Sequence, residues 1–69
     1  MDDVTLRVLI DYTNWRGERG ERVIEPRHIE FTSTEFHKEP QWILKAWDVD
    51  KGAWRDFAMK DVHSWRPTS

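Results

Sequence analysis

Cysteine is absent from this 69-residue chain, which also contains only three glycines and three prolines. Without thiols, neither a disulfide framework nor a thiolate metal site can stabilise the fold. A domain of this size buries only about 60% of the surface that its unfolded chain exposes, so large aromatic side chains or self-association must compensate. The five tryptophans are therefore expected to serve stability first.

Long apolar runs are absent as well. No stretch approaches the roughly 18 apolar residues that a membrane span needs, and the acidic start, Met1 to Asp3, is unlike a signal peptide. The sequence therefore predicts a cytoplasmic protein with no membrane partner. We expect one domain over residues 1–69.

An excess of basic residues is also lacking, because 11 Lys and Arg stand against 13 Asp and Glu, for a net charge of -2. Strong non-specific nucleic-acid binding needs a basic face, so this composition disfavours it. The arginines between residues 16 and 27 are interleaved with glutamates. This pattern favours a solvated hairpin, with a small basic cluster as the alternative.

Catalytic and metal-binding patterns are missing too. The chain has no cysteine nucleophile and no Gly-x-Ser-x-Gly elbow. His28, His37 and His63 are too far apart for a helical metal pair, and the segment from Asp48 to Gly52 lacks the third ligand and the final glutamate of a calcium loop. We expect no enzymatic activity, metal site or cofactor.

What the sequence does contain is strand-like alternation of apolar and polar residues. It predicts strands at 5–13, 21–25, around 29–31, 41–49 and 53–59, with Pro26 at a strand end or bend. Residues 60–65 are predicted as a single helical turn and 66–69 as a tail. This pattern favours an all-β fold, a small five-stranded barrel of the SH3 or Sm type with one short C-terminal helical turn.

The stretch PQWILKAWDVDKGAWRDF, residues 40–57, predicts a hairpin with a defined register. A two-residue loop at Lys51-Gly52 would pair Leu44 with Met59 and Ala46 with Phe57, and would send Trp42 inward with them. The opposite face would then be either covered by the rest of the chain or available to a partner. Its candidate interaction residues are Ile43, Lys45, Trp47 and Trp54.

The sequence resembles the WYL domain in the order of its short motifs over residues 4–65, which is nearly the whole chain. Tyr12 is followed by a Gly-Glu-Arg turn, by Arg22 to Pro26, by Trp42-Ile-Leu44, by Arg55-Asp-Phe57 and by a final Lys60-Asp-Val62 turn. Two positions depart from the family pattern: Ile43 replaces the name-giving tyrosine, and Asp61 stands where an arginine is usual.

The resemblance implies an SH3-like or Sm-like barrel that senses a nucleic acid or nucleotide-like ligand through basic and aromatic residues, here as a stand-alone version without the helix-turn-helix that usually precedes it. Tyr12, Arg22, Trp42 and Arg55 match the family pattern, and Arg16 lies near them in sequence. Two hypotheses follow: a non-enzymatic regulatory module that binds a small anionic ligand or single-stranded nucleic acid at these five residues, or a protein-interaction or homodimerisation module that uses the Trp47 and Trp54 face.

Overall fold

The computed structural model describes residues 6–68, so the acidic first residues and Ser69 of the predicted tail lie outside the described part. The described chain forms one antiparallel sheet of five strands in the order β4-β3-β2-β1-β5. This confirms the predicted all-β class with five strands and one short helical turn. The elements are β1 (Val8–Thr13), β2 (Arg19–Thr32), β3 (Gln41–Asp48), β4 (Ala53–Ala58), the 3-10 turn η1 (Met59–Asp61) and β5 (Val62–Pro67).

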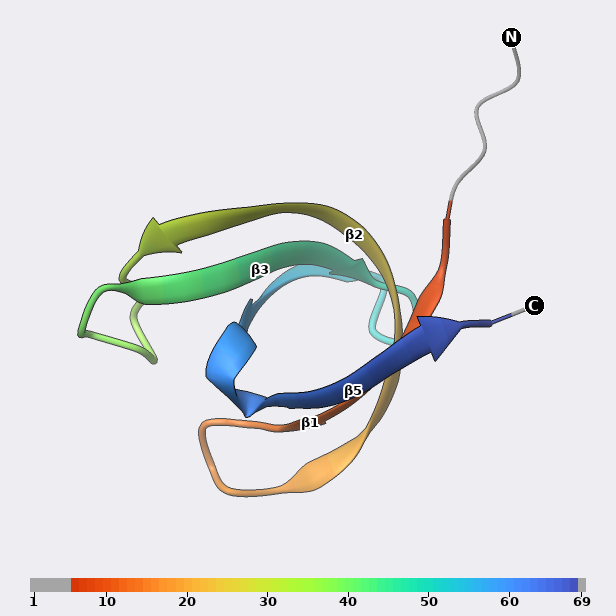
Figure 1. Cartoon of the computed structure of the whole chain (residues 1–69), viewed down its shortest axis with the longest axis horizontal. Helices are drawn as coiled ribbons and strands as arrows, with labels where there is room; N and C mark the ends of the chain where they lie inside the picture. Colours follow the sequence, from red (N-terminus) through yellow and green to blue (C-terminus); the bar gives the residue numbers. More distant parts are fainter. Residues whose placement is uncertain (1–5, 69) are drawn as a thin grey trace, which may run out of the picture.

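The sheet curls so strongly that its two edge strands are joined by a single turn of 3-10 helix. Figure 1 shows β4 continuing into η1 and β5 returning along β1. The curl is possible because β2 has 14 residues and pairs with β1 through its first half and with β3 through its second half. One bent strand therefore belongs to both halves of the ring.

Pro26 lies inside β2, although the sequence predicted a strand end or bend there and two separate strands at 21–25 and 29–31. The ladder to β3 shifts between Pro26 and His28. A bulge of this kind bends a strand and accommodates a proline, which has no N–H to donate. The prediction of a bend was correct, and the prediction of a break was wrong.

The C-terminal segment differs from its prediction. The helical turn covers Met59–Asp61, and residues 62–67 form β5, which pairs with β1 so that Ile10 faces Trp65. The predicted helical turn over 60–65 and tail over 66–69 were wrong. Pairing with β1 satisfies backbone groups that a solvated tail would leave to water, and it adds a strand to the edge that β1 would otherwise expose.

The loop between β3 and β4 has four residues, 49–52, in place of the predicted two. The Asp48 carboxylate accepts a hydrogen bond from the Lys51 N–H at 3.1 Å, and the Asp48 carbonyl accepts one from the Gly52 N–H at 2.8 Å. Gly52 has a φ of +63°, which suits glycine. The pairing therefore slides by two residues, so Leu44 faces Phe57 and Asp48 faces Ala53.

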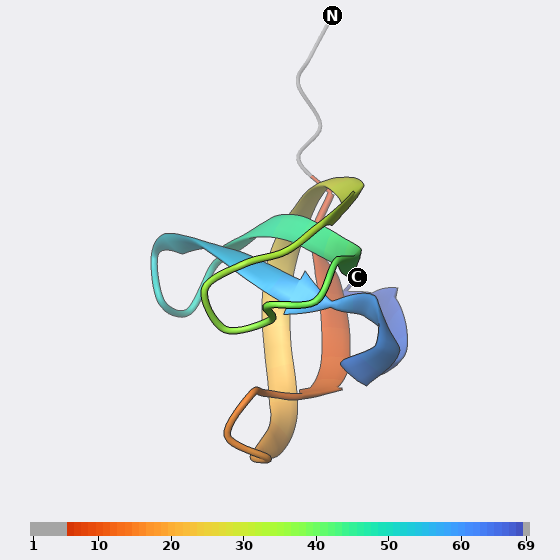
Figure 2. The ribbon, with the colours of Figure 1, turned by 90° about the vertical axis from the view of Figure 1, so that its left-hand side faces the viewer.

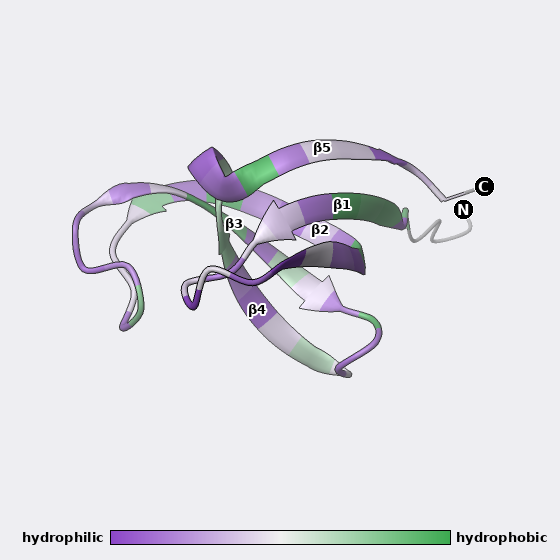
Figure 3. Cartoon of the chain, turned by 90° about the horizontal axis from the view of Figure 1, so that it is seen from below, coloured by the Kyte–Doolittle hydropathy of each residue, from purple (hydrophilic) through white to green (hydrophobic). Residues whose placement is uncertain are grey.

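A slide of two residues leaves every side chain on its predicted face, because strand side chains alternate with a period of two. The core inside the curl consists of Ile10, Tyr12, Ile24, Leu44, Ala46 and Phe57. Figure 3 shows the apolar segment of β1 between β5 and β2.

Two neighbouring residues of β3 contradict the predicted burial. Trp42 is 57% exposed, whereas Ile43 is fully buried. Trp42 shares the face of Leu44, but the β3–β4 ladder ends at Ile43 and Ala58, so Trp42 lies past the end of the core. The assignment of Trp42 to the core and of Ile43 to an open face was therefore wrong.

Candidate functional site

A hollow of about 380 Å³ opens at one mouth of the curled sheet, where three segments meet. The β1–β2 loop, the loop between β2 and β3, and the middle of β4 each contribute to its wall. Figure 2 shows the β2–β3 loop next to β4. The lining residues are Tyr12, Trp15, Thr34, Glu35, Phe36, His37, Trp54, Arg55 and Asp56.

Tyr12 and Arg55, which line this hollow, both lie against the buried ring of Phe57. Tyr12 is only 5% exposed, and its ring meets that of Phe57 edge to face at 4.8 Å. The Arg55 guanidinium lies 6.0 Å from the centre of the Phe57 ring. Strand alternation places Arg55 and Phe57 on the same face of β4, so the cation faces the inside of the curl.

Arg55 is held by a buried carboxylate. Its Nη1 lies 3.7 Å from Oδ2 of Asp48, whose side chain is fully buried, while about a third of the Arg55 side chain is exposed. Oδ2 makes no hydrogen bond to the described residues, so charge attraction is the main link. A buried carboxylate beside a partly exposed guanidinium fixes the position of the cation and leaves part of its planar fork facing the hollow.

Arg22 lies next to this site on β2. The register pairs Arg22 with Ile10 and Gly20 with Tyr12, which places Arg22 diagonal to Tyr12 on the same face. Its Nη1 donates a hydrogen bond to the Glu21 carbonyl at 2.9 Å, and its Nε is buried without a hydrogen-bond partner among the described residues. Arg22 therefore adds positive charge beside Tyr12 without lining the hollow itself.

Two stacked aromatic rings form the rim, and the sequence reasoning missed both. Trp15 and Phe36 lie 4.9 Å apart at an interplanar angle of 14°, and each is more than half exposed. The Arg16 guanidinium lies 5.8 Å from the centre of the Trp15 ring. These rings come from different loops, so no strand periodicity reveals them; an aromatic residue inside an otherwise polar loop is the signal that marks each one.

Asn14 holds the loop that presents Trp15 and Arg16. Its side-chain oxygen accepts hydrogen bonds from the N–H groups of Arg16 and Glu18, both at 2.9 Å, and its amide donates to the Glu18 carboxylate at 3.0 Å. Gly17 completes the turn with a φ of +83°. The hydrogen bond from Asn14, and then the nearby Arg16 guanidinium, hold the pKa of Glu18 below its ordinary value of 4.5.

This loop should therefore respond to acid below the ordinary pKa of a glutamate. The pKa of Glu18 is lower in the folded chain than in the unfolded chain. The stability that its carboxylate contributes is therefore complete above the unfolded-state pKa and is lost as the pH falls through the folded-state pKa. We expect the Trp15 indole N–H resonance to shift in NMR spectra as the pH falls through the lowered pKa of Glu18. The Glu18→Gln variant, which has no proton to gain, should lose this step, and a midpoint at or above 4.5 in the unmodified chain would contradict the expectation.

The structure brings together some of the predicted ligand-binding residues and separates others. Tyr12 and Arg55 share the hollow, Arg16 stands at its rim above Trp15, and Arg22 is adjacent. Trp42 does not line the hollow; its ring lies 5.3 Å from that of Phe31 at the loop end of the β2–β3 hairpin.

The predicted interaction face is also divided. Trp47 is half-buried and meets the exposed ring of Trp54 edge to face at 5.2 Å. Lys45 pairs with Asp56 at 3.0 Å. Ile43 shares this face but is fully buried on it. Arg27 adds to the exposed part, with its guanidinium 4.8 Å from the centre of the Trp54 ring.

Among residues 6–68, no group of three or more His, Cys, Asp and Glu side chains is arranged to hold a metal ion. Within the same range, no helix has the length and apolar character needed to span a membrane.

Comparisons with known proteins agree with this fold. No curated protein matches the chain. One solved structure, proteasome accessory factor B/C (PafBC) of Arthrobacter aurescens, is similar with a TM-score of 0.70 at 23% sequence identity, over 94% of this chain and 9% of that one. This chain thus spans a small part of that protein's length. The family model described as WYL domain matches residues 5–67, and the chain belongs to the WYL domain family.

Proposed function

We propose that this WYL domain is a non-enzymatic, ligand-sensing regulatory module that binds nucleotide chemistry, as a nucleotide-like anion or an unpaired nucleic-acid strand. One observation carries the proposal: a stacked aromatic pair, Trp15 and Phe36, stands over a hollow that also contains the guanidinium of Arg55. Aromatic rings stack nucleobases, and guanidinium groups hold phosphates in a planar fork.

The energetics favour an unpaired base over duplex DNA. Stacking of a base on an aromatic side chain contributes about 1–3 kcal/mol and is available only when the base is not paired. Duplex binding depends on many phosphate contacts, which a chain with a net charge of -2 is poorly suited to make. The nearby acids are partly neutralised, since Asp56 pairs with Lys45. A single phosphate near Arg55, with a base on the rim, fits the hollow best.

A chemical-shift titration with mononucleotides and short single-stranded oligonucleotides tests the proposal. We expect the largest shifts at Tyr12, Trp15, Phe36 and Arg55, and little change with duplex DNA. Arg55→Gln should weaken binding about tenfold or more, because a charge-assisted hydrogen bond contributes roughly 1.5–3 kcal/mol. Trp15→Ala should weaken it by a similar factor through loss of stacking.

The matched control is Arg7→Gln, since Arg7 is an exposed arginine that does not line this hollow. Circular dichroism should establish that each variant remains folded. The proposal fails if no nucleotide or oligonucleotide perturbs the four residues, or if Arg55→Gln binds as the unmodified chain does.

A second candidate function is a protein-interaction face at Trp47 and Trp54. Trp54 is 56% exposed and carries the Arg27 guanidinium over its ring, and tryptophan and arginine are both enriched at interface hot spots. Because Trp54 also lines the hollow, Arg27 distinguishes the two functions. Arg27→Ala should weaken a protein complex and leave nucleotide binding unchanged.

A further inference from the structure

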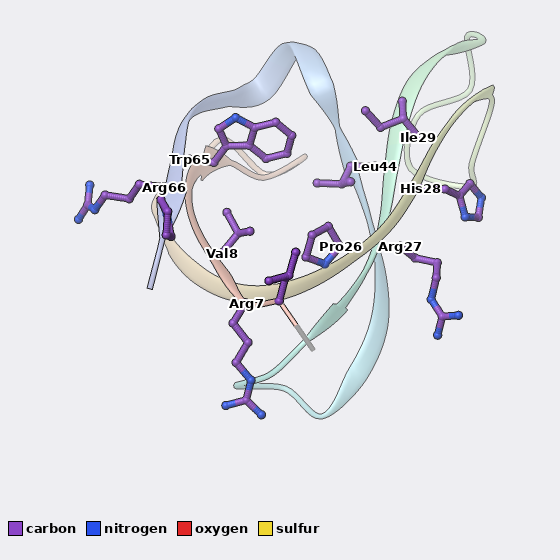
Figure 4. A pocket seen from close by; sticks show the side chains of 11 residues that line it. Arg7, Val8, Pro26, Arg27, His28, Ile29, Leu44, Trp65 and Arg66 are labelled. Carbon is purple, nitrogen blue, oxygen red and sulfur yellow. The ribbon is translucent and has the colours of Figure 1, made fainter. Parts of the chain in front are cut away.

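A second hollow, of about 480 Å³, opens at the opposite mouth of the curled sheet. Its wall is almost entirely apolar and comes from four strands, with Val8, Pro26, Ile29, Leu44, Trp65 and Pro67 as its main apolar contributors. Figure 4 shows Val8, Pro26, Leu44 and Trp65 around the inside of the ring, while the charged ends of Arg7, Arg27 and Arg66 point away from it. This hollow shares no lining residue with the candidate ligand site.

The apolar surface continues beyond the hollow along the β2–β3 hairpin. Ile29 faces Leu44, and Phe31 faces Trp42 two residues further on, so all four side chains share one face of the sheet. Phe31 and Trp42 are 58% and 57% exposed and lie edge to face at 5.3 Å. We call the hollow together with Phe31 and Trp42 the apolar mouth.

The size of the apolar mouth is large for a chain of this length. Its exposed members are Leu6, Ile29, Phe31, Trp42 and Trp65, each between 45% and 69% exposed. With about 150–250 Å² for each aromatic side chain, these five expose roughly 500 Å² of mostly apolar surface. The largest apolar patch on a monomeric protein is typically about 300–600 Å² and is often functional.

The charges at the edge of the apolar mouth indicate which occupant it suits. Arg7 pairs with Glu25 at 3.0 Å, His28 with Glu30 at 3.1 Å, and Arg66 with Glu21 at 3.6 Å. Three arginines, Arg7, Arg27 and Arg66, thus stand against three glutamates, and this balance gives a nucleic acid or an anionic membrane no net attraction. A second copy of the same edge presents both signs, so a rotated copy can place its glutamates opposite the first copy's arginines.

We propose that two copies of this chain associate symmetrically, apolar mouth against apolar mouth. In such a two-fold arrangement the same surface serves both partners. The five exposed side chains alone would remove roughly 1,000 Å² from water across two copies, which reaches the lower limit for a specific interface before the charged edge is counted. Trp42 and Phe31 are the side chains expected to gain most contact, as aromatic anchors do at interface hot spots.

Sedimentation equilibrium of the full chain, over a wide concentration range, tests this association. We expect a reversible dimer that Trp42→Ser weakens about tenfold or more. The matched control is Trp54→Ser, because Trp54 is equally exposed, at 56%, and lies outside the apolar mouth. That variant should leave the dissociation constant unchanged. Both rings are exposed, so both variants should remain folded, which circular dichroism can establish.

Isotope-filtered NMR on a mixture of labelled and unlabelled chains gives an independent measurement. We expect contacts between copies at Ile29, Phe31, Trp42 and Trp65. A monomer at every concentration would overturn the proposal, and so would a dimer that Trp54→Ser disrupts while Trp42→Ser does not. Saturable binding of an apolar dye to a chain that stays monomeric would assign the hollow to a small ligand and would likewise overturn it.

Discussion

Replacing Phe57 by alanine is expected to remove a large part of the free energy of unfolding at room temperature. Phe57 is fully buried, its ring meets that of Tyr12 edge to face, and it belongs to the core cluster with Leu44. Truncating a buried phenylalanine costs about 3–5 kcal/mol. A domain of 69 residues has a total stability of roughly 3–10 kcal/mol. The loss is therefore comparable to the whole free energy of unfolding.

Urea unfolding followed by tryptophan fluorescence measures this loss. Phe36→Ala is the matched control, because it removes the same side chain from a site that is 55% exposed, and it should cost less than about 1 kcal/mol. If Phe57→Ala unfolds at the same urea concentration as Phe36→Ala, then Phe57 does not stabilise the core as its burial indicates. A Phe57 variant that is unfolded in the absence of urea would agree with the expectation.

The faces of the strands could be predicted from the sequence, but the pairing along them could not. Alternation places Leu44, Ala46 and Phe57 on one side in the predicted register and in the observed one, because a slide of two residues preserves each face. The register itself depends on the four-residue loop that Asp48 and Gly52 build. The residues Asp48-Val-Asp-Lys-Gly52 do not specify the length of such a loop, so the two-residue alternative was equally consistent with the pattern.

The alternation of apolar and polar residues also could not predict where along a strand the core ends. Burial at Trp42 depends on where the facing strand ends, and β4 ends opposite Ile43. The strand character of residues 62–67 arises from pairing with β1, which is a tertiary contact. The bend at Pro26 was predictable because proline lacks an N–H, whereas its accommodation by a bulge within one continuous strand was not.

The residues of the candidate site were likewise predicted only in part. Tyr12 and Arg55 were predicted through the resemblance to WYL domains, and they share one hollow. Trp15 and Phe36 were missed because they lie in loops, 21 positions apart in the sequence, where side-chain direction follows no period. Their meeting depends on the Asn14 hydrogen bonds in one loop and on the Thr34 hydroxyl in the other, which accepts hydrogen bonds from the N–H groups of Phe36 and His37.

Ile43 stands at the position of the tyrosine in the WYL pattern. Its buried environment explains why an apolar residue suits this position. The side chain is fully buried beside Ala58, which is itself 1% exposed. A tyrosine hydroxyl buried at this position would need a hydrogen-bond partner, whereas isoleucine needs none. The departure from the family pattern therefore favours packing on this face over a polar contact with a ligand.

Ile43→Ala should consequently destabilise the domain by about 2–5 kcal/mol, the usual range for truncating a buried isoleucine. Trp42→Ala, at the neighbouring position, should cost less than about 1 kcal/mol, since its ring is more than half exposed. Urea unfolding at low protein concentration, where association makes no contribution, compares the two directly. The order is the reverse of what strand alternation alone predicts. If Trp42→Ala proved the more damaging change, the β3–β4 ladder would have to extend past Ile43 and cover Trp42, which would also remove Trp42 from the apolar mouth.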